Sequence, residues 1–238
     1  MPKIDIILVP QGAEYQAVVR GINQAKSYEP LIVPIPMGVS ALEKYLDKYL
    51  SSWLKSEKLL KNNPKTSQVV VLGLCGSLSP QYQCGDVVIS NDCTYVKNNS
   101  VILKQFAHRD LNTWLEYQLR NQARVVSTLT SDRVICTQAE KSQLHQQTQS
   151  QVVDMEGFTI LQQLNPQGMA VGIVRVVSDN SDIDLPEINS ALSEDGALLT
   201  FPLIKSFVAQ PKAAVSLIKG SWQALRVLQQ VAFSLLHT

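Results

Sequence analysis

The chain has 238 residues, of which 45% are apolar and 17% are charged, and its formal net charge is +1. This length suits one α/β domain, and we expect a single domain over residues 1–238. A charge so close to zero indicates neither a nucleic acid nor a membrane as partner. The N-terminus lacks signal-peptide architecture and no apolar run reaches membrane-spanning length, so we expect a cytoplasmic protein.

The residues that usually bind metals do not cluster in this sequence. The three histidines are scattered, and Cys75, Cys84, Cys93 and Cys136 lack metal-ligand spacing. Cys75 stands beside a glycine at the end of an apolar strand, which is typical of a small buried side chain. We therefore expect no metal site.

The first strand leads directly to an acidic residue. The apolar run over residues 4–9 ends at Pro10-Gln11-Gly12, and the spacing of residues 17–22 predicts a helix after it. Glu14 stands between them, where open α/β sheets often place a functional residue. A structural acid in the first turn of a helix is the alternative interpretation.

The next elements continue the alternation of strands and helices. Residues 31–35 predict a strand that lies at a sheet edge or contains a bend, because Pro34 interrupts it and Pro36 follows. Residues 42–54 predict a long amphipathic helix. A fully apolar strand over residues 69–72 runs into Gly73-Leu74-Cys75-Gly76. Glycines at a strand's carboxyl end let the backbone approach a ligand closely.

The middle of the chain contains a hairpin and a capped helix. Strand 87–89 precedes a hairpin over residues 95–103, and a helix over 111–119 is followed by a strand over 125–129. Thr137, with Glu140 three residues on, is a capping box for a polar helix that ends near residue 149.

Two carboxylates fall at the ends of neighbouring elements further on. A β segment at residues 152–153 turns through Asp154-Met155-Glu156 into a helix, and an apolar run over 169–174 ends in Arg175-Val176-Val177-Ser178-Asp179. Glu156 and Asp179 could divide labour, one donating a proton and the other holding hydroxyls or positive charge. A helix N-terminal acid and a capping aspartate are the structural alternative.

Helical patterns cover residues 188–191, 198–208 and 222–236, and Pro211 separates the last two. No repeat or domain linker is present. Strands that alternate with helices predict one three-layer α/β domain.

These motifs, in this order, resemble the purine nucleoside phosphorylase/nucleosidase superfamily, and within it the 5′-methylthioadenosine/S-adenosylhomocysteine nucleosidase branch. The resemblance covers residues 4–182. Its most specific part is Met155-Glu156 followed by Arg175-Val176-Val177-Ser178-Asp179, and Gly73-Leu74-Cys75-Gly76 and Gly85-Asp86-Val87-Val88-Ile89 support it. The tail between Asp184 and Pro211 resembles the hopanoid-associated phosphorylases, which act on an adenosyl lipid.

The resemblance implies an α/β/α fold with a twisted mixed central sheet that is partly closed into a barrel. Asp179 matches the acid that protonates or hydrogen-bonds purine N7, Glu156 the carboxylate that binds the ribose hydroxyls, and Glu14 the acid that activates the attacking water. Arg175 and Ser178 match residues that support the Asp179 loop. The positions matched to substrate binding are Gly73, Cys75, Gly76, Val134, Ile135, Met155, Arg175 and Ser178.

The resemblance also raises the question of the nucleophile. Phosphorolytic members bind phosphate through arginine and hydroxyl groups. Here Leu74 stands where a hydroxyl residue is common, and Pro10-Gln11-Gly12-Ala13 has no arginine. We therefore expect water as the nucleophile and no cofactor, with phosphate as co-substrate only in a phosphorylase. Val134 stands where an aromatic often stacks on the base, which either argues against adenine as the base or implies looser base binding.

Three functions follow from this comparison. The first is hydrolysis of a 5′-substituted adenosine, the second is phosphorolysis, and the third is non-catalytic nucleoside binding. An acid that donates a proton near neutral pH must hold that proton, so we expect Asp179 to be buried and away from cations. By resemblance, we also expect a homo-oligomer.

Overall fold

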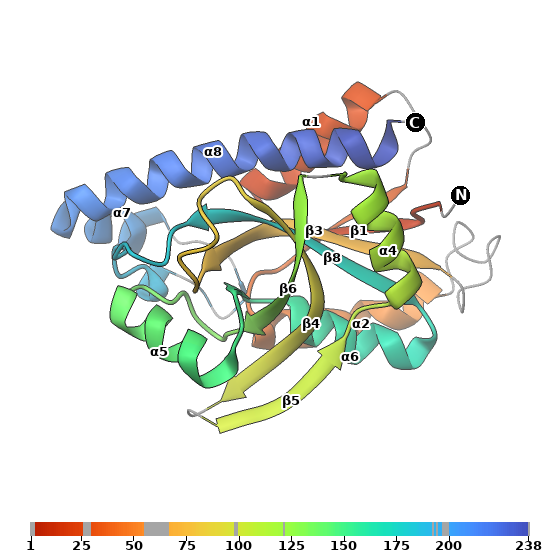
Figure 1. The fold of residues 1–238 in the computed structure, drawn as a ribbon, viewed down its shortest axis with the longest axis horizontal. Helices are drawn as coiled ribbons and strands as arrows, with labels where there is room; N and C mark the ends of the chain where they lie inside the picture. The colour runs from red at the N-terminus through yellow and green to blue at the C-terminus, as the bar shows by residue number, and fades with distance from the viewer. Residues whose placement is uncertain are drawn as a thin grey trace.

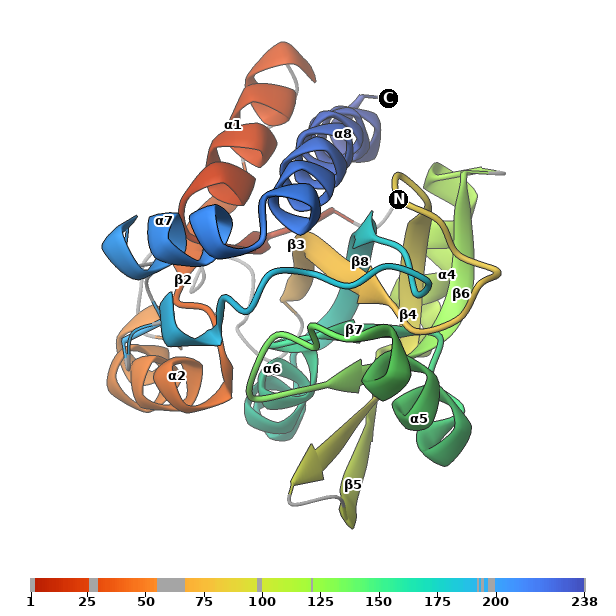
Figure 2. The ribbon, with the colours of Figure 1, turned by 90° about the vertical axis from the view of Figure 1, so that its left-hand side faces the viewer.

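The computed structural model describes residues 3–25, 30–54, 67–97, 100–120, 122–191, 193, 195–196 and 200–237. In it, one mixed sheet runs through the middle of the molecule and helices cover both of its faces (Figures 1 and 2). The strands are β1 (Ile6–Pro10), β2 (Leu31–Ile35), β3 (Gln68–Ser77), β4 (Val87–Lys97), β5 (Ser100–Phe106), β6 (Ala123–Thr130), β7 (Val152–Asp154) and β8 (Ala170–Asp179).

The helices lie between and after these strands. They are α1 (Ala13–Ala25), α2 (Val39–Leu54), α4 (Arg109–Gln118), α5 (Gln138–Thr148), α6 (Gly157–Leu164), α7 (Thr200–Ala209) and α8 (Pro211–Leu236), with short 3₁₀ turns η2 (Asn165–Gln167) and η3 (Asn189–Ala191). The predicted helix over residues 198–208 corresponds to α7, although residues 198 and 199 lie outside the described residues. Among the described residues, no helix has the length and apolarity needed to cross a bilayer.

Strand pairing closes part of the sheet on itself. The strands follow the order β2-β1-β3-β7-β6-β4-β5, and β8 pairs with both β3 and β4. The strands β3, β7, β6, β4 and β8 therefore form a closed ring, from which β1 and β2 extend on one side and β5 on the other. Pairs β1–β2, β1–β3, β3–β8, β4–β6 and β6–β7 are parallel, whereas β3–β7, β4–β5 and β4–β8 are antiparallel. The predicted mixed, partly closed sheet is confirmed.

Two apolar clusters fill the space between the sheet and its helices. One cluster joins side chains of α1, α4 and α8 to one face of the sheet, and the other joins α2 and α6 to the opposite face. The close packing of α1 against α8 explains Gly21, because a Cβ atom there would lie 2.2 Å from the Gln229 carbonyl oxygen. Among the described residues β2 lies at the edge of the sheet, as predicted, and β4 pairs antiparallel with β5, as the predicted hairpin requires.

Candidate active site

A cavity of about 210 Å³ opens where β3 and β8 end and α1 and α6 begin. Glu14, Glu156 and Asp179 all line it, although 165 residue positions separate the first from the last. Of the other positions that the sequence pointed to, Cys75, Gly76, Val134, Ile135, Met155 and Ser178 line the cavity, and Gly73 and Arg175 do not. The wall also contains apolar residues that the sequence analysis did not assign to the site, among them Met37, Leu185, Ile188 and Leu217.

Asp179 lies at the end of β8 and is 6% exposed, as predicted, but it is paired with a cation. The Lys141 ammonium group donates hydrogen bonds to Asp179 Oδ2 at 2.7 Å and to the carbonyl oxygens of Asn180 at 2.7 Å and Ile183 at 3.3 Å. The expectation that Asp179 stands away from cations is therefore wrong. Burial of an isolated ammonium group is costly, and these three acceptors are what makes a fully buried lysine tenable here.

Lys141 was missed because its helix has almost no apolar periodicity. Half of the predicted capping box forms, since the Thr137 hydroxyl accepts a hydrogen bond from the Glu140 N–H at 3.3 Å, whereas the Glu140 carboxylate pairs with Arg133. The buried residues of α5 are Lys141 and Leu144, three positions apart. A lysine on the same face as a buried leucine was the one available sequence signal.

The second oxygen of Asp179 is held by its own strand and faces β3. Ser178 Oγ lies 2.9 Å from Asp179 Oδ1 and 3.1 Å from the Cys75 carbonyl oxygen, so its proton is shared between two acceptors. On β3, a Cβ atom at Gly76 would lie 3.1 Å from Asp179 Oδ2. The glycine thus lets the carboxylate approach the backbone. Ser178 contacts the Asp179 carboxylate, as the role predicted for it requires.

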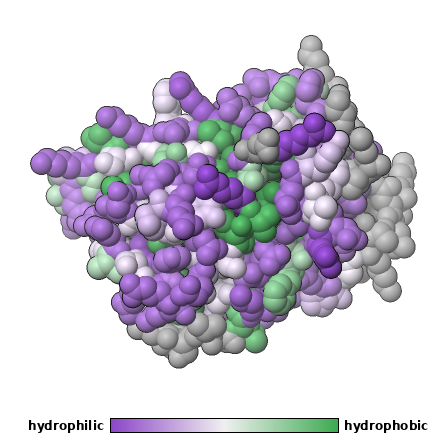
Figure 3. Space-filling view, in the orientation of Figure 1, coloured by the Kyte–Doolittle hydropathy of each residue, from purple (hydrophilic) through white to green (hydrophobic). Residues whose placement is uncertain are grey.

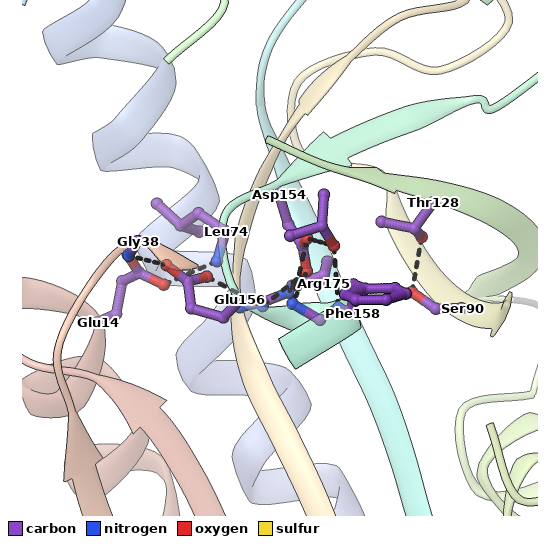
Figure 4. A network of polar contacts seen from close by, with 11 residues as sticks. Glu14, Gly38, Leu74, Ser90, Thr128, Asp154, Glu156, Phe158 and Arg175 are labelled. Carbon is purple, nitrogen blue, oxygen red and sulfur yellow. Dashed lines mark hydrogen bonds and ion pairs between the residues drawn. The ribbon is translucent and has the colours of Figure 1, made fainter. Parts of the chain in front are cut away.

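Arg175 has a different role from the predicted one. Its Nε and Nη2 atoms donate to Asp154 Oδ2 at 3.1 and 2.7 Å, and Nη2 also donates to Glu156 Oε2 at 3.1 Å (Figure 4). All three side chains are buried. Arg175 therefore supports Glu156, and the expectation that it supports the Asp179 loop is wrong. It binds two residues of the Asp154-Met155-Glu156 turn at once, which fixes the shape of that turn.

The other oxygen of Glu156 is bound by the loop before α2. The Gly38 N–H donates to Glu156 Oε1 at 3.1 Å, so both carboxylate oxygens have a partner (Figure 4). Burial raises the pKa of Glu156, and Asp154 adds to this effect, while Arg175 opposes it. Burial by itself would lower the pKa of Arg175, but the carboxylates of Asp154, Glu156 and Glu14 hold it above its usual value.

Glu14 lies across the cavity, in the first turn of α1. Its Oε2 atom accepts a hydrogen bond from the Leu74 N–H at 2.7 Å. Gly73 makes this approach possible, because a Cβ atom there would lie 2.7 Å from Glu14 Oε2 and 2.2 Å from Arg175 Nη1. Burial, followed by the nearby Glu156 carboxylate, raises the pKa of Glu14 from 4.5 to about 7. Such a group changes protonation state near neutral pH and suits a general base.

The backbone of Val134, which was predicted to flank the base, is hydrogen-bonded to the side chain of Asn189. The Val134 N–H donates to Asn189 Oδ1 at 2.8 Å, and Asn189 Nδ2 donates to the Val134 carbonyl oxygen at 3.0 Å. Both backbone groups of Val134 are therefore engaged by η3. A ligand meets the apolar side chains of Val134 and Ile135 at this end of the cavity, unless it displaces Asn189.

Comparison with known proteins places the chain in a family. The sequence profile of the phosphorylase superfamily matches residues 56–198, whereas no curated protein sequence matches. The 5′-methylthioadenosine/S-adenosylhomocysteine nucleosidase of Helicobacter pylori is similar in structure, with a TM-score of 0.65 at 13% identity over 95% of this chain and 94% of that one. The futalosine hydrolase of H. pylori strain 26695 has a TM-score of 0.62 at 14% identity and covers 95% of both chains.

A third similar structure is the S-adenosylhomocysteine nucleosidase of Streptococcus pyogenes in complex with 5-methylthiotubericidin. Its TM-score is 0.62 at 15% identity, over 99% of this chain and 98% of that one. At such identities the likeness concerns the fold, and it agrees with the ring of strands described above. Because the family profile spans more than half of the chain, this protein belongs to the phosphorylase superfamily, as its motifs predicted.

Proposed function

We propose that this protein hydrolyses the N-glycosidic bond of a 5′-substituted adenosine, of the methylthioadenosine type, to adenine and a ribose derivative. The observation that carries the proposal is that Glu14, Glu156 and Asp179 meet around one cavity. The similar structures include nucleosidases for methylthioadenosine and S-adenosylhomocysteine, which supports this substrate class. The apolar side chains of Met37 and Leu217 in the cavity wall suit an apolar 5′ group.

Cleavage of this bond makes the sugar cationic and the purine anionic. In the proposed mechanism, Glu156 binds the ribose hydroxyls and stabilises the positive charge that develops on the sugar. Glu14 takes a proton from the attacking water, which its pKa of about 7 permits in neutral solution. Asp179 interacts with N7 of the leaving purine.

The lysine changes how Asp179 can act on N7. Asp179 Oδ2 is bound to the Lys141 ammonium group, and among the described residues the hydrogen-bond partner of Asp179 Oδ1 is Ser178. We therefore propose that Asp179 meets purine N7 through Oδ1, while Lys141 holds Oδ2 in place.

Water is favoured over phosphate because the cations at this site are already paired. Arg133 pairs with Glu140, Lys141 with Asp179, and Arg175 with Asp154 and Glu156. Arg20 lies on the far side of α1, where its Nε donates to Gln229 Oε1 at 3.3 Å. Among the described residues that line the cavity, no cation is left without a carboxylate partner to bind a phosphate dianion.

Product analysis tests the proposal. Methylthioadenosine incubated with the protein is expected to give adenine and methylthioribose at a rate that does not depend on added phosphate. Formation of methylthioribose 1-phosphate would instead show a phosphorylase. Stabilisation of the protein by adenine or methylthioadenosine in a thermal-shift assay, without turnover of a panel of 5′-modified adenosines, would show a binding protein.

The pH dependence of activity reports on Glu14. Because the base must be ionised, kcat/KM is expected to fall by about tenfold per pH unit below the Glu14 pKa of about 7. The Glu14→Gln variant keeps an oxygen that can accept from the Leu74 N–H but cannot take a proton, so it should lose both the activity and this acidic limb. A limb that persists in Glu14→Gln with most of the activity would assign the base to another group.

The raised pKa of Glu14 also predicts how the free energy of unfolding depends on pH, whatever reaction the protein catalyses. Between pH 4.5 and about 7 the folded protein holds the Glu14 proton while the unfolded chain has lost it, so rising pH lowers the free energy of unfolding. The Glu14→Gln variant lacks this penalty, and its stability relative to the wild type should therefore rise across that interval. Urea unfolding at several pH values measures the difference, and Glu116→Gln, on an exposed face of α4, is the matched control.

A further inference from the structure

The charges of the chain are distributed unevenly along the sequence. All 20 aspartate and glutamate residues lie before residue 196, and the segment 196–238 contains none. This segment carries four cations spaced by seven residues: Lys205, Lys212, Lys219 and Arg226. The net charge of +1 for the whole chain therefore conceals a strongly basic C-terminal part.

Three of these cations lie along one side of α8, since seven residues correspond to about two helical turns. All four are exposed. Next to them runs an apolar stripe of Val215, Ile218 and Trp222, which are 50%, 51% and 64% exposed. At the end of the molecule where α7 and the start of α8 lie, hydrophobic side chains stand among hydrophilic ones (Figures 1 and 3).

We define the α8 outer face as Lys212, Val215, Ile218, Lys219, Trp222 and Arg226. The opposite side of the same helix is buried in the protein: Ala214 and Ala224 are in the interior and Leu217 lines the cavity. The first half of α8 is thus an amphipathic helix whose second apolar side has no partner within the described part of the chain. Val208 of α7, 76% exposed, adds to the apolar area beside it.

We infer that the α8 outer face docks on an anionic lipid surface. A helix that lies in a membrane interface presents apolar side chains and a tryptophan to the lipid, with lysine and arginine beside them for the headgroups. The α8 outer face has this composition, and the Arg226 guanidinium stacks on the Trp222 ring at 4.6 Å. Residues 196–238 contain no aspartate or glutamate side chain that would oppose the attraction.

Charge also decides between the possible partners. In a two-fold contact with a second copy, the same surface would face itself, and the cations of the α8 outer face would repel one another. A nucleic acid would satisfy the cations but not the stripe formed by Val215 and Ile218. The expectation of no membrane partner rested on the net charge of the whole chain, and the inference departs from it because the charge is unevenly distributed along the chain.

Co-sedimentation with lipid vesicles tests the inference on the full chain. The protein is expected to bind vesicles of phosphatidylcholine with phosphatidylglycerol at least tenfold more tightly than vesicles of phosphatidylcholine alone. Lys212→Glu/Lys219→Glu and, separately, Ile218→Ser/Trp222→Ser should each lower this binding at least tenfold. All four positions are exposed, so circular dichroism and the thermal midpoint should remain those of the wild type.

Lys44→Glu/Arg109→Glu is the matched control, because it changes the net charge equally at exposed sites on α2 and α4. This variant should bind vesicles like the wild type. The inference is overturned if the wild type does not bind anionic vesicles, or if the control loses as much binding as the α8 variant. Tighter binding to a DNA duplex than to vesicles, or a wild-type dimer that Ile218→Ser/Trp222→Ser dissociates, would assign the surface to another partner.

Discussion

Replacement of Asp179 by asparagine is expected to lower kcat by roughly 10²–10⁴-fold, which is the usual contribution of a positioned general acid. Asparagine has nearly the same shape, so it can still contact Ser178 and Lys141, but it cannot carry the proton that the leaving purine needs. Steady-state kinetics with methylthioadenosine measures the loss. Activity close to that of the wild type would remove Asp179 from the mechanism.

The structure adds a second consequence that the sequence did not reveal. Asp179→Asn leaves the buried Lys141 ammonium group without its anion, although two carbonyl oxygens still accept hydrogen bonds from it. Loss of one partner of a buried ion pair costs about 3–5 kcal/mol, so this variant is expected to be less stable as well as inactive. The double variant Lys141→Met/Asp179→Asn removes both charges and should recover stability without recovering activity. Recovery of both would show that the loss of activity came from misfolding.

Replacement of Arg175 by methionine is expected to have the largest effect on stability. Arg175 is fully buried and binds Asp154 and Glu156 directly, so its removal leaves two buried carboxylates without a cation. We expect the free energy of unfolding to fall by at least about 3–5 kcal/mol, which is a large fraction of the stability of an ordinary domain.

Urea unfolding measures this effect, and Arg133 provides the matched control. Arg133 also pairs with a glutamate, Glu140, but lies largely in solvent. Arg133→Met should therefore change the free energy of unfolding by less than about 1 kcal/mol. Equal effects of the two substitutions would mean that burial of the Arg175 cluster contributes nothing to stability.

Sequence patterns predicted the elements that end at the site better than the contacts within it. The apolar runs that became β3 and β8 are buried on both sides, so their length and their polar ends were readable from the chain. The places where Glu14, Glu156 and Asp179 emerge followed from those ends, since strand termini on one edge of a sheet converge.

The pairing of charges could not be read in the same way. Motifs place Arg175 near both Glu156 and Asp179, but only the register of β8 against β3 decides which carboxylate it reaches. Lys141 lies on a polar helix whose sequence gives little sign of which face is buried. The same limitation applies to α8, where the sequence predicted a helix only over residues 222–236 and only the fold shows which of its apolar side chains are covered.

The closed ring of strands has a consequence for how the protein avoids aggregation. Within the described residues, closure leaves β2 and β5 as the outermost strands. Each contains a residue that disfavours pairing with a strand of another molecule. Pro34 removes a backbone donor from β2, and Lys104 places a partly exposed ammonium group on β5, where it pairs with Asp92. Pairing of β2 or β5 with a strand of another molecule is thus disfavoured. The strands of the closed ring are already paired on both sides.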